Sequence, residues 1–265
     1  QSIYSFRGAV DAMQSFPGVR KTLTRSFRFG PSVARAANAV LAQKGETLEV
    51  IGCGGPSKVL FGERPDDALL LTFTNAEALE AAVQRKGEEV WFAGGIKAYR
   101  TDRILDGYRL FANKAGEVRD REMKRCRSLG HLEGYAREIN SVDLLAICGF
   151  VRRYGDEIPR MLDDLAKRAV DSQEEASFCI STAHKAKGLE FPKVALGTIF
   201  DWEDYVAQRE KRFTREMVEQ LNLLYVAATR AINELYADVT LAHAIAEYEG
   251  LSVEQLTGGL MCAAA

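Results

Sequence analysis

Hydrophobic residues recur along the chain with two periods, and their alternation predicts strands followed by helices. Five short apolar runs, bounded by turn residues, have the length of buried strands: 19–24, 68–73, 89–92, 177–182 and 193–199. After the first run comes a helical stripe with the spacing i, i+3, i+4, i+7, i+8, formed by Val33, Ala36, Ala37, Val40 and Leu41. Pro31 suits the first turn of that helix and Gly45 its end.

Three further segments extend this pattern. Thr74 and Glu77 have the spacing of a capping box and predict a helix to about Arg85. A nearly all-apolar segment, 217–231, predicts a buried helix, and 234–241 is expected to close the sheet. Between 98 and 175 the chain is charged, helical and without strong strand signals. Its expected apolar face is Ile104, Leu105, Tyr108, Leu110 and Phe111. The whole therefore predicts a parallel α/β domain with a helical insertion.

Composition narrows the class of protein. The chain has 265 residues, 47% hydrophobic and 27% charged, as expected of an ordinary globular protein. No apolar run approaches the roughly 18 residues that cross a bilayer. No signal peptide is recognisable at the N-terminus. The five cysteines are scattered without a C-x-x-C pair, which favours reduced thiols and no metal site. We therefore expect a cytoplasmic protein without a membrane partner.

Charge is balanced overall but uneven locally. The net charge of −2 gives no global sign of nucleic-acid binding. Residues 1–44, however, hold seven basic and one acidic side chain, and residues 97–137 hold eleven basic and six acidic. A solvated surface and a nucleic-acid track both explain these stretches.

Four segments carry the candidate chemistry, and together they resemble the motifs of UvrD/Rep-like superfamily 1 DNA helicases. They resemble motif III at 1–9 (QSIYSFRGA), motif IV at 23–29 (LTRSFRF), motif V at 180–191 (ISTAHKAKGLEF) and motif VI at 221–231 (LNLLYVAATRA). Within that family, SFRFGP at 26–31 and GGIK at 94–97 are most similar to the F-box DNA helicase branch and its bacterial and phage relatives. The resemblance implies a RecA-like parallel sheet flanked by helices, the second motor domain of a P-loop helicase.

The segment similar to motif III offers contacts to both nucleotide and DNA. The resemblance gives Gln1 the role of sensing the γ-phosphate or the attacking water. Tyr4 and Phe6 are flat faces on which unpaired bases can stack, and Arg7 can reach a phosphate. Packed core aromatics are the structural alternative for Tyr4 and Phe6.

Motifs IV and VI imply an arginine-lined phosphate site. By position, Phe27 would lie against the adenine and Arg28 would bind the γ-phosphate, where a planar guanidinium can grip two oxygens. Arg230, at the end of the apolar helix, would act as an arginine finger. An ordinary surface arginine is the alternative for each.

Motif V adds nucleotide and DNA contacts. Glu190 would accept a hydrogen bond from the ATP ribose, and Thr182 and His184 would contact a DNA phosphate. Asn75 matches a family position that touches single-stranded DNA. Here the chain departs from the family, because Phe73 replaces a common arginine and removes one phosphate contact.

The phosphate-binding loop of such enzymes is absent from these 265 residues. G-x-x-x-x-G-K-[ST] needs a Gly-Lys dipeptide, and the sequence contains none. The turn at 52–58 (GCGGPSK) has the wrong spacing. A strand-terminal acidic pair for Mg²⁺ is also missing, and the nearest candidate, Asp201, lies downstream of motif V. We expect this chain to hold half of a bipartite ATP site, with the Mg²⁺ ligands elsewhere, and to be inactive as an ATPase alone.

These inferences define the expected organisation. Residues 1–18 would end the first motor domain, 19–97 and 176–265 would form the second (2A), and 98–175 the insertion (2B-like). The function expected is that of an ATP-dependent DNA helicase and single-strand translocase in DNA repair. It would be monomeric and would work with single-stranded DNA and the missing N-terminal motor domain. The alternatives are a non-catalytic single-stranded nucleic-acid-binding or regulatory module that retains the fold, and the helicase half of a helicase–nuclease.

Overall fold

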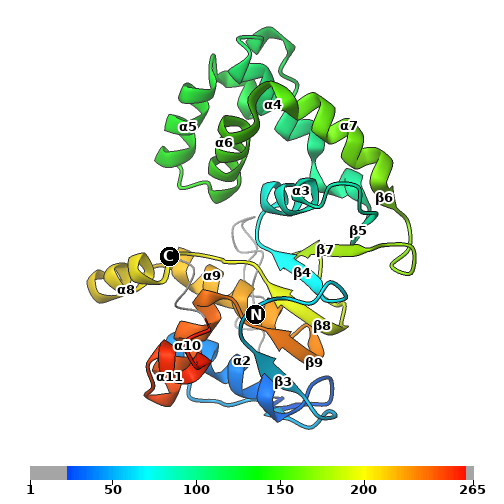
Figure 1. The fold of residues 1–265 in the computed structure, drawn as a ribbon. Helices are drawn as coiled ribbons and strands as arrows, with labels where there is room; N and C mark the ends of the chain where they lie inside the picture. Colours follow the sequence, from blue (N-terminus) through cyan, green and yellow to red (C-terminus); the bar gives the residue numbers. More distant parts are fainter. Residues whose placement is uncertain (1–22, 261–265) are drawn as a thin grey trace, which may run out of the picture. The chain divides into compact units, whose positions relative to one another are not determined.

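The computed structural model describes residues 23–260, which form two compact units (Figure 1). Unit 1 contains the described residues up to Leu71 and those from Ala186 onward, and unit 2 is Thr72–Lys185. The strands of the main sheet have the order β3-β9-β8-β4-β7-β5-β6. The pairings between β3 and β9, β9 and β8, β8 and β4, β7 and β5, and β5 and β6 are all parallel. The predicted α/β class with a parallel sheet flanked by helices is therefore confirmed.

Unit 1 contains the predicted nucleotide-site residues Phe27, Arg28, Glu190 and Arg230. Its elements are β1 (Arg25–Ser26), α2 (Pro31–Gln43), β2 (Ile51–Gly52), β3 (Lys58–Leu60), β4 (Leu69–Thr72, ending at the boundary), β8 (Phe191–Leu196), α8 (Trp202–Lys211), α9 (Arg215–Ala228), β9 (Ala231–Tyr236), α10 (Val239–Glu249) and α11 (Val253–Thr257). As the sequence predicts, α2 begins at Pro31, and Gly45 follows its end with a φ of +72°. Helix α2 packs against α9 and α10 through a fully buried face of alanine and valine, which lets the helices approach closely.

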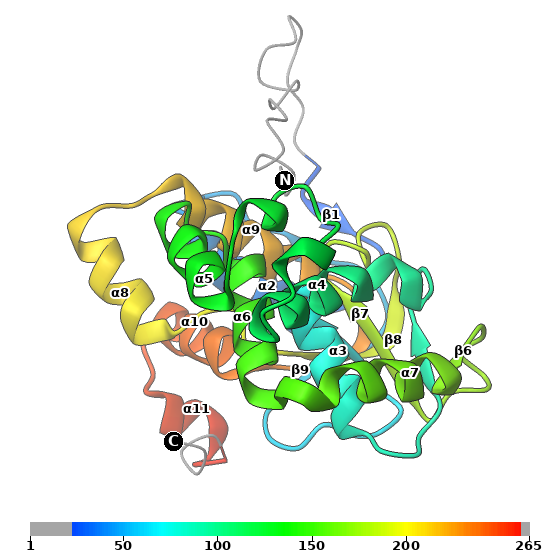
Figure 2. The same cartoon turned by 90° about the horizontal axis from the view of Figure 1, so that it is seen from above.

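Unit 2 combines three strands with a helical block. Its elements are α3 (Asn75–Gln84), β5 (Val90–Phe92), η2 (Ile96–Tyr99), α4 (Thr101–Phe111), η3 (Ala115–Glu117), η4 (Met123–Arg125), α5 (Leu129–Glu138), α6 (Val142–Tyr154), η5 (Gly155–Glu157), α7 (Ile158–Arg168), β6 (Ala169–Val170) and β7 (Phe178–Thr182). Helix α6 packs against α3, α4 and α5, and Figures 1 and 2 both show α4, α5 and α6 side by side.

The predicted capping box at the start of α3 is confirmed. The Thr74 side chain accepts a hydrogen bond from the Glu77 backbone N–H at 3.1 Å, and the Glu77 carboxylate accepts one from the Thr74 N–H at 3.1 Å. The other end of α3 is closed by Arg168, whose guanidinium donates to the carbonyls of Arg85 and Glu88 at 3.0 and 2.7 Å. The start of α3 is therefore capped by its own residues, whereas the carbonyls that follow its end are bound by a side chain from α7.

Three strand predictions need correction. The described part of the segment predicted at 19–24 is not strand, and β1 begins at Arg25. The strand expected at 193–199 runs instead from Phe191 to Leu196. The segment 234–241 is strand only to Tyr236, because Asp238 caps a new helix, α10, with its side chain accepting from the backbone N–H groups of Thr240 and Leu241.

The helical block also differs in detail from its prediction. It ends in a short strand, β6, which the sequence did not indicate. On α4, Phe111 is 41% exposed rather than on the apolar face, whereas Asp106 is 2% exposed. The proposed limits of the 2A and 2B-like parts stay a prediction. No helix within residues 23–260 is long and apolar enough to span a membrane.

Candidate functional site

Three predicted nucleotide-site residues lie together in unit 1. The Arg28 Nε donates to Glu190 Oε2 at 2.8 Å, and Arg28 Nη1 lies 3.4 Å from the Thr229 carbonyl oxygen. The Arg230 Nη1 donates at 2.9 Å to the carbonyl of Leu189, the neighbour of Glu190. Residues from motifs IV, V and VI therefore meet at one place, although the chain separates Arg28 from Arg230 by about 200 positions.

Glycines position the segment that bears Arg28. The loop after β2 pairs with it through Cys53 N–H to Ser26 O at 2.7 Å and Gly54 N–H to Phe29 O at 2.9 Å. A Cβ at Gly30 would lie 2.1 Å from the Gly55 carbonyl oxygen, and one at Gly54 would lie 2.8 Å from the Phe29 backbone. Only glycine permits this approach. The glycine-rich turn whose spacing excluded a phosphate loop thus supports the motif IV segment.

Arg230 is held rigidly at the C-terminal end of α9. It is 6% exposed, and its Nε donates to the Val226 carbonyl at 2.8 Å while Nη2 donates to Thr229 Oγ1 at 3.2 Å. The unpaired carbonyls at a helix C-terminus favour a cation. With the bond to Leu189, three of the five guanidinium N–H groups are engaged.

Burial and a like charge shift the titration of Arg230. Burial in the fold, followed by the nearby positive charge of Arg28, lowers the pKa of Arg230 to about 10, against the opposing effect of Glu190. Arg230 therefore remains a cation at neutral pH. Two guanidinium groups and one carboxylate give this cluster a net positive charge, which suits an anionic ligand.

One member of the cluster, Glu190, and one neighbour, Phe27, face solvent. The Phe27 side chain is 78% exposed, and the side chain of Glu190 is 55% exposed. An exposed phenylalanine next to Arg28 is available to lie against a flat ring. The loop that leads to Glu190 turns at Gly188, which has a φ of +94° that L-residues rarely adopt.

A second polar cluster lies in unit 2 and contains the predicted DNA-contact residue Asn75. Lys185 Nζ donates to Asn75 Oδ1 at 2.6 Å and lies 4.4 Å from the centre of the Tyr99 ring. Tyr99 is fully buried, and its hydroxyl lies 3.3 Å from the Ala93 and Ile180 carbonyls. A buried tyrosine thus supports a lysine beside Asn75.

The remaining predicted DNA contacts differ in accessibility. Thr182 is 2% exposed, and its hydroxyl lies 3.4 Å from the Lys185 N–H, so it shapes the motif V turn from within. His184 is half-buried.

Four predicted site residues lie outside the described part of the chain: Gln1, Tyr4, Phe6 and Arg7. Conversely, sequence reasoning missed Lys185 and the Thr229 carbonyl. The position of Lys185 within the motif V string was the one available signal for it. The backbone oxygen of Thr229 has no signature in the sequence.

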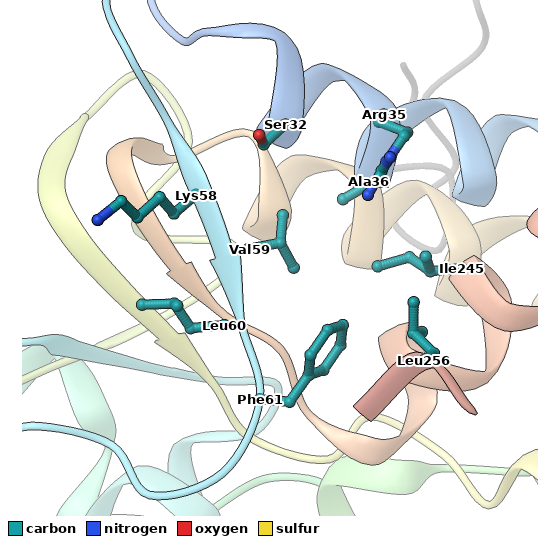
Figure 3. Close-up of a pocket in the computed structure, with 9 residues that line it drawn as sticks. All are labelled: Ser32, Arg35, Ala36, Lys58, Val59, Leu60, Phe61, Ile245 and Leu256. Atoms are coloured by element: carbon teal, nitrogen blue, oxygen red, sulfur yellow. The ribbon is translucent and has the colours of Figure 1, made fainter. Parts of the chain in front are cut away.

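Two other features lie apart from these clusters. Among residues 23–260, no group of three or more His, Cys, Asp or Glu side chains is placed to hold a metal ion. A cavity of about 220 Å³ opens in unit 1 between α2, β3, α10 and α11 (Figure 3). None of its lining residues was a predicted site residue: Ser32, Arg35, Ala36, Lys58, Val59, Leu60, Phe61, Ile245 and Leu256.

Comparison with known proteins agrees with this fold. Residues 135–241 match the UvrD-like helicase C-terminal domain. This match covers less than half of the chain, and the parallel α/β sheet is consistent with the RecA-like architecture that the motifs imply.

The chain is also distantly similar to two curated proteins over most of its length. It is 28% identical to F-box DNA helicase 1 of Gallus gallus over 93% of this chain and 26% of that protein. It is 28% identical to F-box DNA helicase protein 1 of Schizosaccharomyces pombe over 98% of this chain and 32% of that protein. The chain thus spans about a quarter to a third of these relatives.

Proposed function

We propose that the chain is the second motor-domain portion of an ATP-dependent DNA helicase and single-strand translocase. In this proposal it contributes half of the ATP site and part of the DNA track. The observation that carries the proposal is the meeting of Arg28, Glu190 and Arg230 in unit 1. The family match and the names of the relatives support it.

The cluster has the chemistry for one side of a triphosphate. Arginine forks bind phosphate oxygens in pairs, and the exposed Phe27 beside Arg28 can cover an adenine. The phosphate loop and Mg²⁺ ligands are not among these residues, so a first motor domain would supply them. Mg²⁺ bound there would neutralise charge on the β- and γ-phosphates.

Arg230 would act as the arginine finger of this site. Its three internal hydrogen bonds hold the guanidinium in one position, and two N–H groups remain for a ligand. A cation fixed before reaction stabilises developing charge on the transferred phosphoryl group without reorganising. The ordered position of Arg230 is thus suited to the transition state.

Glu190 would change partner when nucleotide binds. In the structure its Oε2 accepts a hydrogen bond from Arg28 Nε. A triphosphate would compete for Arg28, and the released carboxylate could accept a hydrogen bond from the ribose. Because Arg28 and Glu190 are both partly exposed, breaking their ion pair costs little, about 0.2–1 kcal/mol.

The unit 2 cluster would serve the DNA track. Lys185 and Asn75 supply an ammonium and an amide beside each other, and both chemistries bind phosphate and sugar. Thr182 would order the motif V turn that carries His184 and Lys185. A non-catalytic module that retains the helicase fold is the competing function, and no observation on either cluster favours it.

The experiment is ATP hydrolysis by a protein in which this chain is joined to the first motor domain, with and without single-stranded DNA. The proposal expects turnover that DNA stimulates strongly and that Arg230→Ala removes. Binding of DNA without any ATP hydrolysis would support the non-catalytic module instead.

A further inference from the structure

A basic segment joins α4 to α5 in unit 2 (Figure 1). Residues 114–127, called here the basic strap, contain six cationic side chains, all exposed: Lys114, Arg119, Arg121, Lys124, Arg125 and Arg127. Within residues 23–260, none of the six forms an ion pair. No residue of the strap belongs to the helicase-like motifs.

The strap is ordered by its own buried residues. Val118, Met123 and Cys126 are at most 4% exposed. Because these apolar side chains alternate with the cations, the strap is fixed to the helical block along one side and presents charge along the other.

A buried carboxylate fixes the strap backbone as well. Asp106 of α4, 2% exposed, accepts hydrogen bonds from the backbone N–H groups of Arg119 at 3.1 Å and Asp120 at 2.7 Å. Asp120 in turn accepts from the N–H groups of Glu122 and Met123 at 3.0 and 3.1 Å. The cations are thus carried on a backbone with defined turns rather than on a free loop.

Two acidic residues of the strap, Asp120 and Glu122, pair with Arg103, and Arg100 also lies 3.6 Å from Asp120. Arg103 lies 3.1 Å from Asp120 and 2.8 Å from Glu122, and it also pairs with Asp143 at 2.8 Å. The side chain of Arg103 is only 15% exposed, so this pairing is directed inward. Glu117 remains as the one exposed acid of the strap that forms no ion pair within residues 23–260, against six exposed cations.

We infer that the basic strap binds the phosphate backbone of nucleic acid, apart from the motif residues of the track. Side chains with long aliphatic stems on an ordered backbone can follow a row of phosphates without reading bases. The affinity gained in this way comes from released counterions and depends steeply on salt. The inference rests on the proposed function, because nucleic acid is the polyanion that this function requires. Single strand and duplex present the same phosphate chemistry.

The test compares two triple variants of the full chain that change its charge equally. The strap variant is Arg121→Gln/Lys124→Gln/Arg125→Gln. The control variant replaces exposed cations of unit 2 that are already paired with acids: Arg137→Gln, Arg153→Gln and Lys167→Gln. Affinity for a fluorescent oligonucleotide, single-stranded or duplex, is measured from 50 to 200 mM salt.

The strap variant is expected to lose at least about tenfold in affinity at 50 mM salt. Its slope of log K against log [salt] should fall by about 2 for single strands or about 3 for duplex. A larger loss on one of the two substrates identifies which of them the strap contacts. Lys124→Arg keeps the charge and should retain wild-type affinity, and equal melting temperatures show that the variants are folded.

Two results would overturn the inference. If the strap and control variants have the same slope on both substrates, the strap makes no phosphate contacts, and the proposed helicase function is untouched. If the wild-type chain binds neither substrate, the inference and the proposed DNA track both fail.

Discussion

Arg28 and Glu190, 162 positions apart in the chain, form an ion pair with 2.8 Å between Nε and Oε2. The pair joins the segment after β1 to the loop before β8, and it lies beside the buried Arg230. If the cluster binds nucleotide, Glu190 and a phosphate compete for the same guanidinium. Because of this competition, replacing Glu190 and replacing Arg28 should have different effects on nucleotide binding.

Glu190→Gln should therefore change the binding of two ligands to different extents. Loss of the carboxylate releases Arg28, so tripolyphosphate is expected to bind up to about fivefold more tightly, the equivalent of one exposed ion pair. ATP should gain less or bind more weakly, because the ribose loses a charged acceptor. Calorimetric titration of both ligands into the protein with both motor domains measures the difference.

Arg28→Gln should have the opposite effect, because it should weaken the binding of both ATP and tripolyphosphate. Arg35→Gln is the matched control, because Arg35 is a cation of α2 with an exposed side chain and is paired with Glu249. If Glu190→Gln bound ATP and tripolyphosphate more tightly by the same factor, a hydrogen bond from the ribose to Glu190 would be excluded.

Arg230→Ala should lower DNA-stimulated ATP turnover by about 10³–10⁵-fold and change ATP affinity by less than about threefold. An arginine finger acts on the transition state, so kcat carries the effect. Single-turnover hydrolysis and equilibrium ATP binding, measured on the same preparation, separate the two quantities.

Loss of Arg230 also leaves the Leu189 carbonyl without its guanidinium donor, at a cost of about 1–3 kcal/mol, whereas the Val226 carbonyl still accepts from the Thr229 hydroxyl. Arg230→Lys keeps the positive charge but lacks the planar guanidinium. It should therefore restore protein stability more fully than the rate of ATP turnover. Arg215→Ala, at the exposed start of α9, is the control. Turnover of Arg230→Ala within threefold of wild type would exclude a role in catalysis.

Asp106→Ala should destabilise the protein by about 3–5 kcal/mol, because it leaves the Arg109 guanidinium and two strap N–H groups without their buried acceptor. Asp102→Ala is the matched control from the same helix. Asp102 pairs with Arg100 with 64% of its side chain exposed, so less than about 1 kcal/mol is expected. Urea unfolding measures both, and equal effects would mean that Asp106 does not hold the strap.

His243 should give unit 1 a pH dependence in mildly acidic solution. Its ring stacks on Trp202 with centroids 5.5 Å apart, and burial lowers the pKa of His243 below its ordinary value, against the charge of Glu203. The unfolded chain therefore binds the proton more readily. Stability is fully present above the ordinary pKa, near 6.5, and is lost as pH falls through the folded pKa.

Trp202 reports this titration directly. In a Trp91→Phe background Trp202 is the remaining tryptophan, and protonation of the stacked imidazole should quench its emission with a midpoint below pH 6.5. His243→Gln should abolish the titration. A midpoint at or above 6.5 would contradict the effect of burial.

Local patterns made part of this structure predictable. The capping box of Thr74 and Glu77 lies within four residues, and the start of α2 at Pro31 follows from one fixed dihedral. The positions of Arg28, Glu190 and Arg230 came from resemblance, because no periodicity brings residues so distant together. Their proximity is now a structural observation, whereas their roles stay proposals.

Other features depend on tertiary context that a sequence pattern does not contain. Asp106 interrupts the expected apolar face of α4, because a carboxylate can be buried when backbone N–H groups and an arginine surround it. The residues around Gly30 and Gly54 in the sequence give no sign that glycine is needed there. The need arises because backbone from the facing segment packs against both positions. The strand predicted at 234–241 includes the first turn of α10, because the sequence pattern did not identify Asp238 as a cap.

The central claim is that Arg28, Glu190 and Arg230 form one wall of a nucleotide site. A crystal structure of the protein with both motor domains and a non-hydrolysable ATP analogue tests this most directly. The account predicts that the Arg28 and Arg230 guanidinium groups both contact the triphosphate and that Glu190 has exchanged Arg28 for the ribose. A nucleotide bound elsewhere, with the Arg28–Glu190 pair intact, would contradict it.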